Sequence, residues 1–169
     1  MTLTDDAQAG DPENTLVMEI EHGTIVIELF PDVAPKHVAR IKELTRQGFY
    51  DGVVFHRVMD GFMAQTGDPT GTGSGGSGQN IEAEFSTVPF TRGTVGMARA
   101  QNPNSGDSQF FIMFDDGSFL NGQYTVWGRV TEGMDAVDKI KKAPAGRQSG
   151  QVDDPDNIIT MKVQADIAQ

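Results

Sequence analysis

The stretch FHRVMDGFMAQTGDP, residues 55–69, combines side chains that a simple core strand does not require. It places one permanent cation, Arg57, near the large apolar residues Phe62 and Met63 and the amide Gln65. Successive side chains of a strand point to opposite faces, so Met63 and Gln65 share a face. The stretch therefore predicts an apolar surface beside a charged donor. The plainer alternative is a core strand that carries a surface arginine.

The stretch QFFIM, which begins at Gln109, repeats this theme. Period-two alternation puts Gln109 and Phe111 on one face and Phe110 and Ile112 on the other. We expect the second pair to lie in the core. The segment FLNG, residues 119–122, adds apolar bulk beside a turn.

Alternation also marks the N-terminal part of the chain. Apolar and polar residues alternate from Thr15 to Glu21 and again up to Leu29, with His22-Gly23 between the two runs. This pattern predicts a β-hairpin with glycine in its turn. Residues 1–13 are polar, and we expect them to form a flexible tail, which leaves residues 14–169 as one domain.

Two segments have the apolar spacing of helices. One lies between Pro35, which suits a first helical turn, and Gly48, which suits the residue after a helix. The other is expected over residues 132–141, with Thr131 as its N-cap. The other apolar stretches are short, the last of them at residues 157–163, and they show no βαβ rhythm. Many short strands with two helices predict an antiparallel barrel or sandwich.

Composition excludes several classes of protein. The 169 residues include no cysteine, which removes disulfide scaffolds, thiolate metal sites and a cysteine nucleophile. With 24 acidic against 13 basic residues the net charge is −11, so we expect neither nucleic acid nor an anionic membrane surface as partner. The N-terminal segment lacks the basic and apolar regions of a signal peptide, so we expect a cytoplasmic location.

Two motifs mimic known sites without the context those sites need. The stretch GTGSGG, residues 71–76, matches a dinucleotide fingerprint, but the segment after it is too short and too β-like for the required helix. We expect a surface loop with special backbone angles there. The triplet Gly106-Asp107-Ser108 is similar to the nucleophile turn of trypsin-like proteases, but no glycines follow Ser108 to build an oxyanion hole.

The three histidines indicate no metal site. His22, His37 and His56 have no ligand-like spacing, and their positions fall in a turn, a helix and a strand. Next to Arg57 on a strand, His56 is expected to face the opposite side as a structural histidine with its hydrogen bonds satisfied.

Together the motifs closely resemble the cyclophilins, the cyclophilin-type peptidyl-prolyl cis-trans isomerases, and above all their bacterial-type members. The similarity spans about residues 15–163, and its markers are FHRV at 55–58, GFMAQTGDP at 61–69, GTGSGG at 71–76, GMARAQNPNSGDSQFFI at 96–112, FLNG at 119–122 and VWGRV at 126–130. The resemblance implies a mainly β fold, a closed eight-stranded antiparallel β-barrel capped by two α-helices, with the site on the outer face of the barrel.

The resemblance also implies roles for individual residues. It assigns catalysis to Arg57 and Gln65, with no metal and no cofactor. It assigns substrate binding to nine further residues: Phe62, Met63, Ala98, Arg99, Gln109, Phe111, Phe119, Leu120 and Tyr124.

Three of these positions depart from a common family pattern. Phe119 stands where many eukaryotic cyclophilins have a tryptophan that is important for binding cyclosporin, so cyclosporin-type cyclic peptides are expected as ligands of reduced affinity. Tyr124 stands where a pocket histidine often lies, and Arg99 replaces a frequent asparagine. None of the three changes Arg57.

The function that the resemblance implies is the rotation of X–Pro peptide bonds, which assists protein folding. The expected partners are proline-containing peptides and unfolded or folding proteins, and the family default is a monomer. The alternative is a cyclophilin-fold chaperone or scaffold that holds proline-containing segments without significant turnover. A hydrolase is a more distant possibility.

Overall fold

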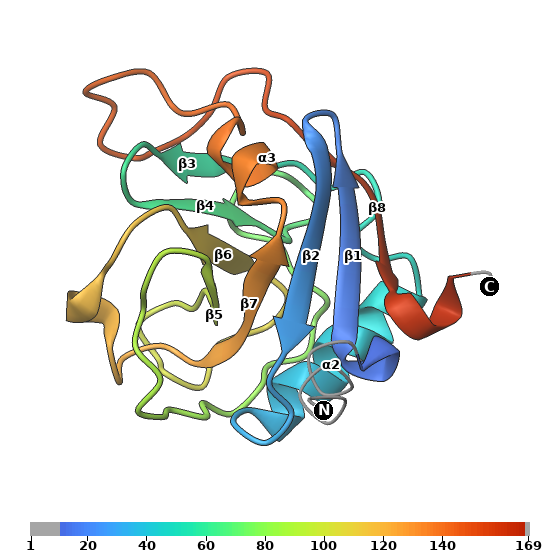
Figure 1. Cartoon of the computed structure of the whole chain (residues 1–169). Coiled ribbons are helices and arrows are strands. Elements are labelled where there is room, and N and C mark those ends of the chain that lie inside the picture. Colours follow the sequence, from blue (N-terminus) through green and yellow to red (C-terminus); the bar gives the residue numbers. More distant parts are fainter. Residues whose placement is uncertain (1–10, 168–169) are drawn as a thin grey trace, which may run out of the picture.

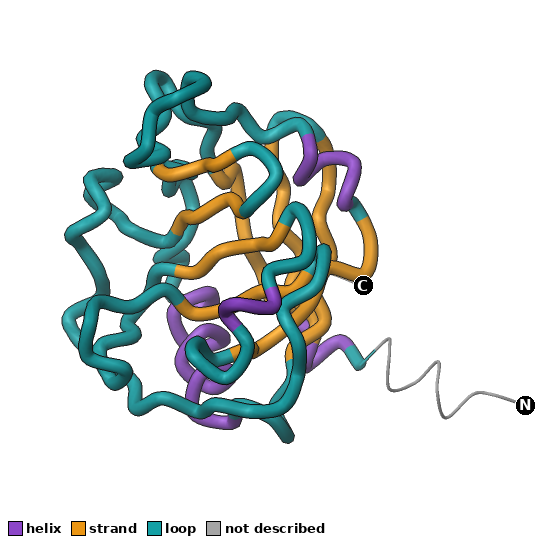
Figure 2. Tube along the Cα trace, turned by 90° about the vertical axis from the view of Figure 1, so that its left-hand side faces the viewer, coloured by secondary structure: helices purple, strands orange, loops and turns teal. Residues whose placement is uncertain are grey.

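The computed structural model describes residues 11–167 as an eight-stranded antiparallel sheet with two α-helices (Figures 1 and 2). The strands are β1 (Thr15–Ile20), β2 (Gly23–Leu29), β3 (Arg57–Met59), β4 (Met63–Thr66), β5 (Thr94–Met97), β6 (Phe110–Met113), β7 (Val126–Glu132) and β8 (Ile158–Val163). The helices are α2 (Pro35–Arg46) and α3 (Met134–Asp138), and three short 3-10 turns are η1 (Pro12–Asn14), η2 (Ser118–Leu120) and η3 (Gln164–Asp166).

The sheet is an open half-barrel, so the expectation of a closed barrel is wrong. Its strand order is β3-β4-β6-β5-β7-β2-β1-β8, and within the described residues no ladder joins the edge strands β3 and β8. Backbone hydrogen bonds from the segment before β3 cross this seam, with the N–H of Gly52 and of Phe55 donating to the carbonyls of Ile158 and Asp156. Gly52 has a φ of +82°, and after it the segment forms only an isolated bridge, between Val54 and Asn157.

The predicted hairpin is confirmed, but its turn lies at Glu21-His22, and Gly23 is the first residue of β2 instead of a turn residue. β1 and β2 pair in register from Thr15 opposite Glu28 to Ile20 opposite Gly23, which leaves a two-residue turn. The alternating apolar residues of both strands are buried in the main core, as the period-two pattern requires.

Only part of the expected N-terminal tail is described. Residues 1–10 lie outside the described residues. From Asp11 the chain has regular structure, because the Asp11 carboxylate accepts a hydrogen bond from the N–H of Glu13 and caps η1. Glu13 in turn forms ion pairs of 2.9 Å with Lys42 and with Arg46 on α2. Attachment to α2 therefore begins before residue 14.

The first predicted helix is confirmed, and the second is shorter than predicted. α2 begins at Pro35 and is followed by Gly48 at a φ of +73°. α3 starts at Met134 because Thr131, the expected cap, is still part of β7, and the pairing of β7 with β2 continues to Glu132. Gly133, with a φ of +92°, makes the turn from strand to helix.

Two apolar clusters lie on opposite faces of the sheet. Along β6, Phe110 and Ile112 enter the main core, which β1, β2 and α2 also fill. Phe111 and Met113 point to the other face and form a second cluster with Met63 of β4. This second cluster is the floor of the groove described below.

Gly133 offers a direct test of how α3 is held against the hairpin. A Cβ at this position would lie 2.1 Å from the backbone oxygen of Thr24, whereas at Gly146, with a similar φ of +83°, it would meet nothing within 4 Å. A left-handed non-glycine residue costs about 1–3 kcal/mol. We expect Gly146→Ala to lower the free energy of unfolding by that strain alone and Gly133→Ala to lower it clearly further, as measured by urea denaturation. Equal losses would contradict this packing.

Candidate active site

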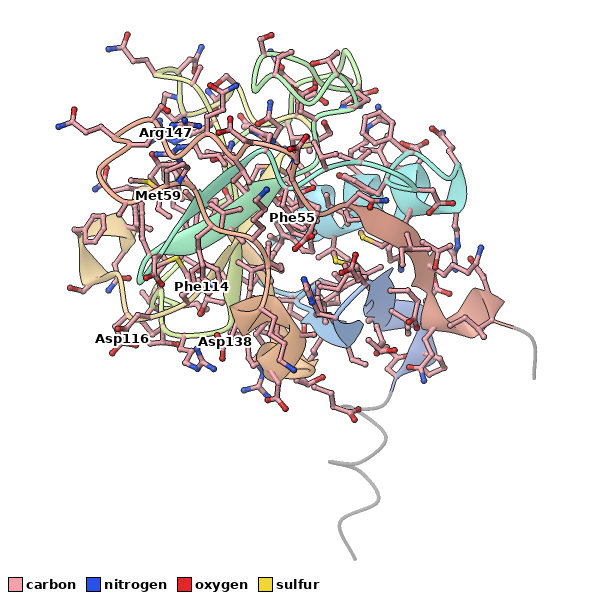
Figure 3. All side chains as sticks on the ribbon, turned by 90° about the horizontal axis from the view of Figure 1, so that it is seen from above. Phe55, Met59, Phe114, Asp116, Asp138 and Arg147 are labelled. Atoms are coloured by element: carbon pink, nitrogen blue, oxygen red, sulfur yellow. The ribbon has the colours of Figure 1, made fainter. Side chains whose placement is uncertain are left out.

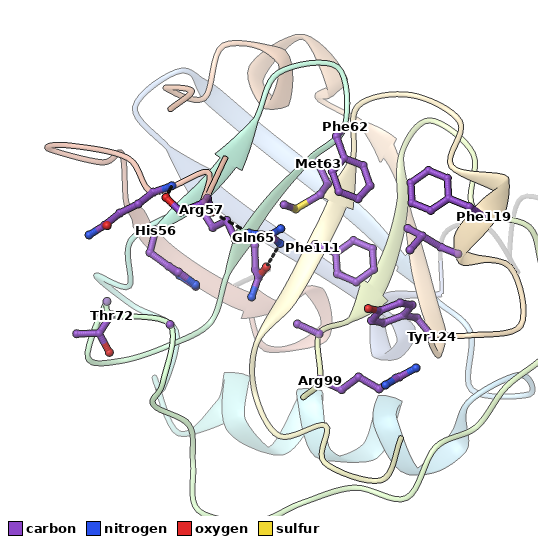
Figure 4. Close-up of a pocket in the computed structure, with 16 residues that line it drawn as sticks. His56, Arg57, Phe62, Met63, Gln65, Thr72, Arg99, Phe111, Phe119 and Tyr124 are labelled. Carbon is purple, nitrogen blue, oxygen red and sulfur yellow. Dashed lines mark hydrogen bonds between the residues drawn. The ribbon is translucent and has the colours of Figure 1, made fainter. Parts of the chain in front are cut away.

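A groove of about 600 Å³ lies over the second apolar cluster (Figure 4). Its walls contain every predicted site residue except Gln109, which lines an adjoining polar hollow. The groove is lined by His56, Arg57, Phe62, Met63, Gln65, Gly71, Thr72, Gly73, Ala98, Arg99, Phe111, Phe119, Leu120, Tyr124, Ser149 and Gln151.

Arg57 is fixed by neutral acceptors on three sides. It begins β3 directly opposite Gln65 of β4, and its Nη1 donates to Gln65 Oε1 at 3.0 Å. Its Nε donates to the backbone oxygen of Ser149 at 3.1 Å, and its Nη2 lies 3.5 Å from the sulfur of Met59. A guanidinium has five N–H donors in one plane, so this frame leaves donors available on the groove side.

A chain of amides continues from Arg57 to the glycine-rich loop, and Figure 4 shows its first hydrogen bond, between Arg57 and Gln65. Gln65 Nε2 donates to Gln109 Oε1 at 2.8 Å. Gln109 Nε2 donates to the carbonyls of Gly73 and Gly75 at 3.0 and 2.9 Å. Gln109 therefore lies outside the groove but fixes the orientation of the Gln65 amide, and through it the position of Arg57.

The other half of the groove is an apolar pocket. Its floor consists of Met63, Phe111 and Leu120, which are buried to 1%, 5% and 8% exposure. The ring of Tyr124 meets the ring of Phe111 edge-on at 5.8 Å. Phe119 is 69% exposed. The pocket is thus closed and apolar at its floor and open at the edge occupied by Phe119.

Phe119 forms that open edge together with Phe62. Their ring centroids lie 5.6 Å apart, and η2 carries Phe119 there. A phenyl ring presents apolar surface but has no N–H donor, in contrast to an indole.

The glycine-rich loop is organised by the buried carboxylate of Asp68, which is why a phosphate cradle does not form. Asp68 Oδ2 accepts the N–H groups of Gly73 and Gly75 at 2.6 and 3.0 Å, and Oδ1 accepts the N–H and hydroxyl of Thr70. Burial alone would raise the pKa of Asp68, but these donors hold the pKa well below its usual value. A Cβ on Gly75 would lie 2.2 Å from Asp68 Oδ1, so the approach needs glycine.

The prediction for His56 is wrong. His56 lines the same groove as Arg57, and its buried Nδ1 has no hydrogen-bond partner among the described residues (Figure 4). The strand alternation does not apply because β3 begins only at Arg57. Burial, assisted by the charge of Arg57, lowers the pKa of His56 against the opposing effect of Asp68.

Sequence reasoning also missed the loop between α3 and β8. Ser149 and Gln151 line the groove, and Gln151 forms an isolated bridge with Arg57. The loop passes close to Met59, since a Cβ at Gly150 would lie 2.7 Å from Met59 Cγ (Figure 3, where Met59 and Arg147 of this loop are labelled). The one available signal was Gly150, whose φ of +74° allows this approach.

The remaining charged groups offer no metal site. Within residues 11–167 no group of three or more His, Asp or Glu side chains is arranged to hold a metal ion. His22 pairs with Asp156 at 2.9 Å, and His37 pairs with Glu84 at 2.6 Å. Each histidine thus has one carboxylate partner, which is far from it in the sequence.

The helices that the structure describes are too short or too polar to span a membrane.

Comparison with known proteins identifies the family. A family model described as cyclophilin type peptidyl-prolyl cis-trans isomerase/CLD matches residues 15–163. The chain belongs to the cyclophilins. A Brucella suis protein described as a probable peptidyl-prolyl cis-trans isomerase is 58% identical over 172 residues, covering 95% of this chain and 87% of the relative. Peptidyl-prolyl cis-trans isomerase B of Bacillus subtilis is 46% identical over 113 residues, covering 66% and 78%.

Solved cyclophilin structures agree with this assignment. The cyclophilin AquaCyp293 of Hirschia baltica matches with a TM-score of 0.85 at 29% identity, covering 99% of this chain and 81% of that one. A Cryptosporidium parvum cyclophilin-type isomerase, crystallised in the presence of the dipeptide Ala-Pro, matches with a TM-score of 0.79 at 30% identity, covering 88% and 98%. The activity of this cyclophilin is peptidyl-prolyl cis-trans isomerisation.

The Asp68 carboxylate should stabilise this cyclophilin only while it is ionised. Asp68→Asn turns one acceptor oxygen into a donor that faces backbone N–H groups, and we expect it to cost about 1–3 kcal/mol of unfolding free energy at pH 7. The pKa of Asp68 is lower in the folded protein than in the unfolded chain. The wild type should therefore have a larger free energy of unfolding than Asp68→Asn above the unfolded pKa of about 3.9, and this difference should decrease as the pH falls below that value. Urea denaturation between pH 7 and pH 2.5 measures this.

Asp60→Asn is the control, since Asp60 is an exposed carboxylate in the turn between β3 and β4. It should change stability by less than about 0.5 kcal/mol. A cost for Asp68→Asn that is independent of pH, or no larger than the cost of Asp60→Asn, would contradict the role assigned to Asp68.

Proposed function

We propose that this cyclophilin rotates X–Pro bonds by holding the prolyl ring in the apolar pocket and offering the Arg57 guanidinium to the twisted amide. The reaction needs no nucleophile and no net proton transfer, because it breaks only amide resonance, with a barrier of about 18–20 kcal/mol. The two X–Pro isomers differ by only about 0.5–1 kcal/mol, yet they exchange over tens to hundreds of seconds. A catalyst must therefore bind the twisted amide better than either planar form.

The observation that carries this proposal is the frame around Arg57. In the twisted amide the prolyl nitrogen becomes pyramidal and regains a lone pair, which a fixed N–H donor can stabilise. Gln65, Ser149 and Met59 hold the guanidinium in place, and none of them carries a charge that would neutralise it. Pre-aligned donors of this kind avoid reorganisation during the reaction.

Gln65 acts beside Arg57 in this proposal. Both ends of its amide are bonded within the protein, to Arg57 and to Gln109. This arrangement supports a positioning role for Gln65 in place of the catalytic role that the resemblance assigns to it.

The apolar pocket suits the ring of a proline. Met63, Phe111 and Leu120 offer a floor without charge, and Phe62, Phe119 and Tyr124 stand around it. A pyrrolidine ring held there stays fixed while the preceding residue rotates. The Cryptosporidium parvum relative, whose structure was determined in the presence of the dipeptide Ala-Pro, supports proline-containing peptides as the ligand class.

The biological substrates in this proposal are unfolded and folding proteins that carry X–Pro bonds. The cytoplasmic location, the monomeric state and the extent of the domain over residues 14–169 stay predictions. A binding module without turnover is the alternative, and the intact frame around Arg57 favours catalysis over it.

Arg57→Ala tests the mechanism. We expect the variant to keep its fold and to lose about 10²–10³-fold in kcat/KM on a short X–Pro peptide, the scale for removal of one pre-aligned donor. A protease-coupled assay or NMR exchange spectroscopy measures the rate, and circular dichroism checks the fold. Arg129→Ala is the matched control, since that arginine is exposed on β7 and pairs with Glu28.

Near wild-type turnover in folded Arg57→Ala would refute the mechanism. Wild-type protein that binds the peptide but does not accelerate exchange would instead establish the binding module.

Phe119 provides a test of the ligand class. We propose that cyclosporin-type cyclic peptides bind weakly here because the exposed Phe119 ring cannot donate a hydrogen bond. Phe119→Trp adds an indole donor at the open edge and should lower the cyclosporin Kd about 5–100-fold, the range of one hydrogen bond and added ring area. Titration calorimetry measures this, and an unchanged Kd would show that the indole is not what limits binding.

A further inference from the structure

Arg99 lines both the groove and the adjoining polar hollow, and four of its five N–H donors are bonded to backbone carbonyls. Nε and Nη2 donate to the carbonyl of Gln123 at 3.1 and 2.7 Å. Nη1 donates to the carbonyls of Ala100 and Gln101 at 3.0 and 3.2 Å. One side chain thus joins the loop that follows β5 to the loop that precedes β7.

Arg99 also stacks on the pocket wall. Its Cζ lies 4.6 Å from the centroid of the Tyr124 ring, and both residues are half-buried. The ring of Tyr124 also packs edge-on against the rings of Phe111 and Phe90, with centroid distances of 5.8 and 6.5 Å. Tyr124 is therefore held between a cation and the floor of the apolar pocket (Figure 4).

The charge of Arg99 is not used in an ion pair. Of the seven arginines in the described chain, five form ion pairs with a carboxylate, and only Arg57 and Arg99 have none within 4.0 Å. Unlike Arg57, Arg99 has four of its five N–H donors bonded to backbone carbonyls and one face stacked on Tyr124, so the fold uses its shape as a planar donor.

We propose that Arg99 is a positioning residue for substrate binding: its guanidinium ties the loop after β5 to the loop before β7 and holds Tyr124 edge-on against Phe111. This inference rests on the apolar pocket being the proline site. It replaces the expected direct contact of Arg99 with substrate, because backbone carbonyls accept hydrogen bonds from four of its five N–H donors and Tyr124 covers one face of the guanidinium.

Lysine cannot take over this role. An ammonium is a point charge with three donors, whereas the contacts of Arg99 need a planar fork that reaches carbonyls in two loops and lies over a ring at the same time. The charge-conserving substitution Arg99→Lys therefore separates shape from charge.

The test is a kinetic double-mutant cycle between Arg99 and Tyr124 on an X–Pro peptide. We expect Arg99→Lys, Arg99→Ala and Tyr124→Ala each to raise KM about three- to ten-fold while kcat changes less than two-fold, since the pocket binds ground and transition states alike. The double variant Arg99→Ala/Tyr124→Ala should be no worse than Tyr124→Ala alone. Arg129→Lys, a conservative change on the exposed face of β7, should leave both constants unchanged.

NMR gives a readout that does not depend on turnover. The ring resonances of Tyr124 and Phe111 should shift in Arg99→Lys and stay in place in Arg129→Lys. Thermal unfolding of each variant separates a local rearrangement from a general loss of stability.

Three results would overturn the proposal. The first is an unchanged KM and unchanged ring resonances in Arg99→Lys. The second is additive effects of the two substitutions on KM in the double variant. The third is a KM of Arg99→Lys that equals the wild-type KM but depends strongly on salt, which would assign a direct electrostatic role to the charge. Failure of the Arg57 mechanism would look different, because it would leave kcat unchanged in Arg57→Ala, whereas the Arg99 test is read from KM and from spectra with Arg57 intact.

Discussion

The site depends on the period-two alternation of side chains along β4 and β6. Phe110 and Ile112 pack into the main core, while Phe111 and Met113 face the groove, so each strand stabilises the fold with one face and builds the site with the other. The pairing of Gln65 with Phe111 across these strands brings the polar and the apolar halves of the site together. A shift of the strand register by one residue would move the core side chains to the groove and the groove side chains to the core. Because both sets of side chains are buried, such a shift would be costly.

The second requirement is a cation without a counter-ion. A carboxylate beside Arg57 would hold it firmly but would also neutralise the field felt by a developing lone pair. Neutral acceptors from β4 and from the Ser149 loop give the same orientation without that loss. The carboxylate of Asp68 is bonded to N–H groups of the glycine-rich loop and fixes the conformation of that loop. Gln109 and Gln65 connect the loop to Arg57 by hydrogen bonds.

Local periodicity explains what the sequence could predict. The hairpin, α2 and the two faces of β6 follow from patterns within a few residues, and the groove residues follow from resemblance to the cyclophilins. Barrel closure, the length of α3 and the environment of His56 depend on partners far along the chain, which no local pattern encodes. The Ser149 contact is the clearest case, because a backbone carbonyl carries no sequence signature.

The positions that depart from the common family pattern all lie on the binding side of the groove. Arg99, Tyr124 and Phe119 stand around the apolar pocket, whereas Arg57 is positioned by β3, β4 and the loop before β8. The barrier to rotation is intrinsic to the amide, so the demand on the cation is the same for every X–Pro bond. The pocket rim meets side chains that differ from one substrate to another. Variation can therefore collect at the rim and change which prolyl segments bind, while the charge that stabilises the twisted amide stays where the sheet holds it.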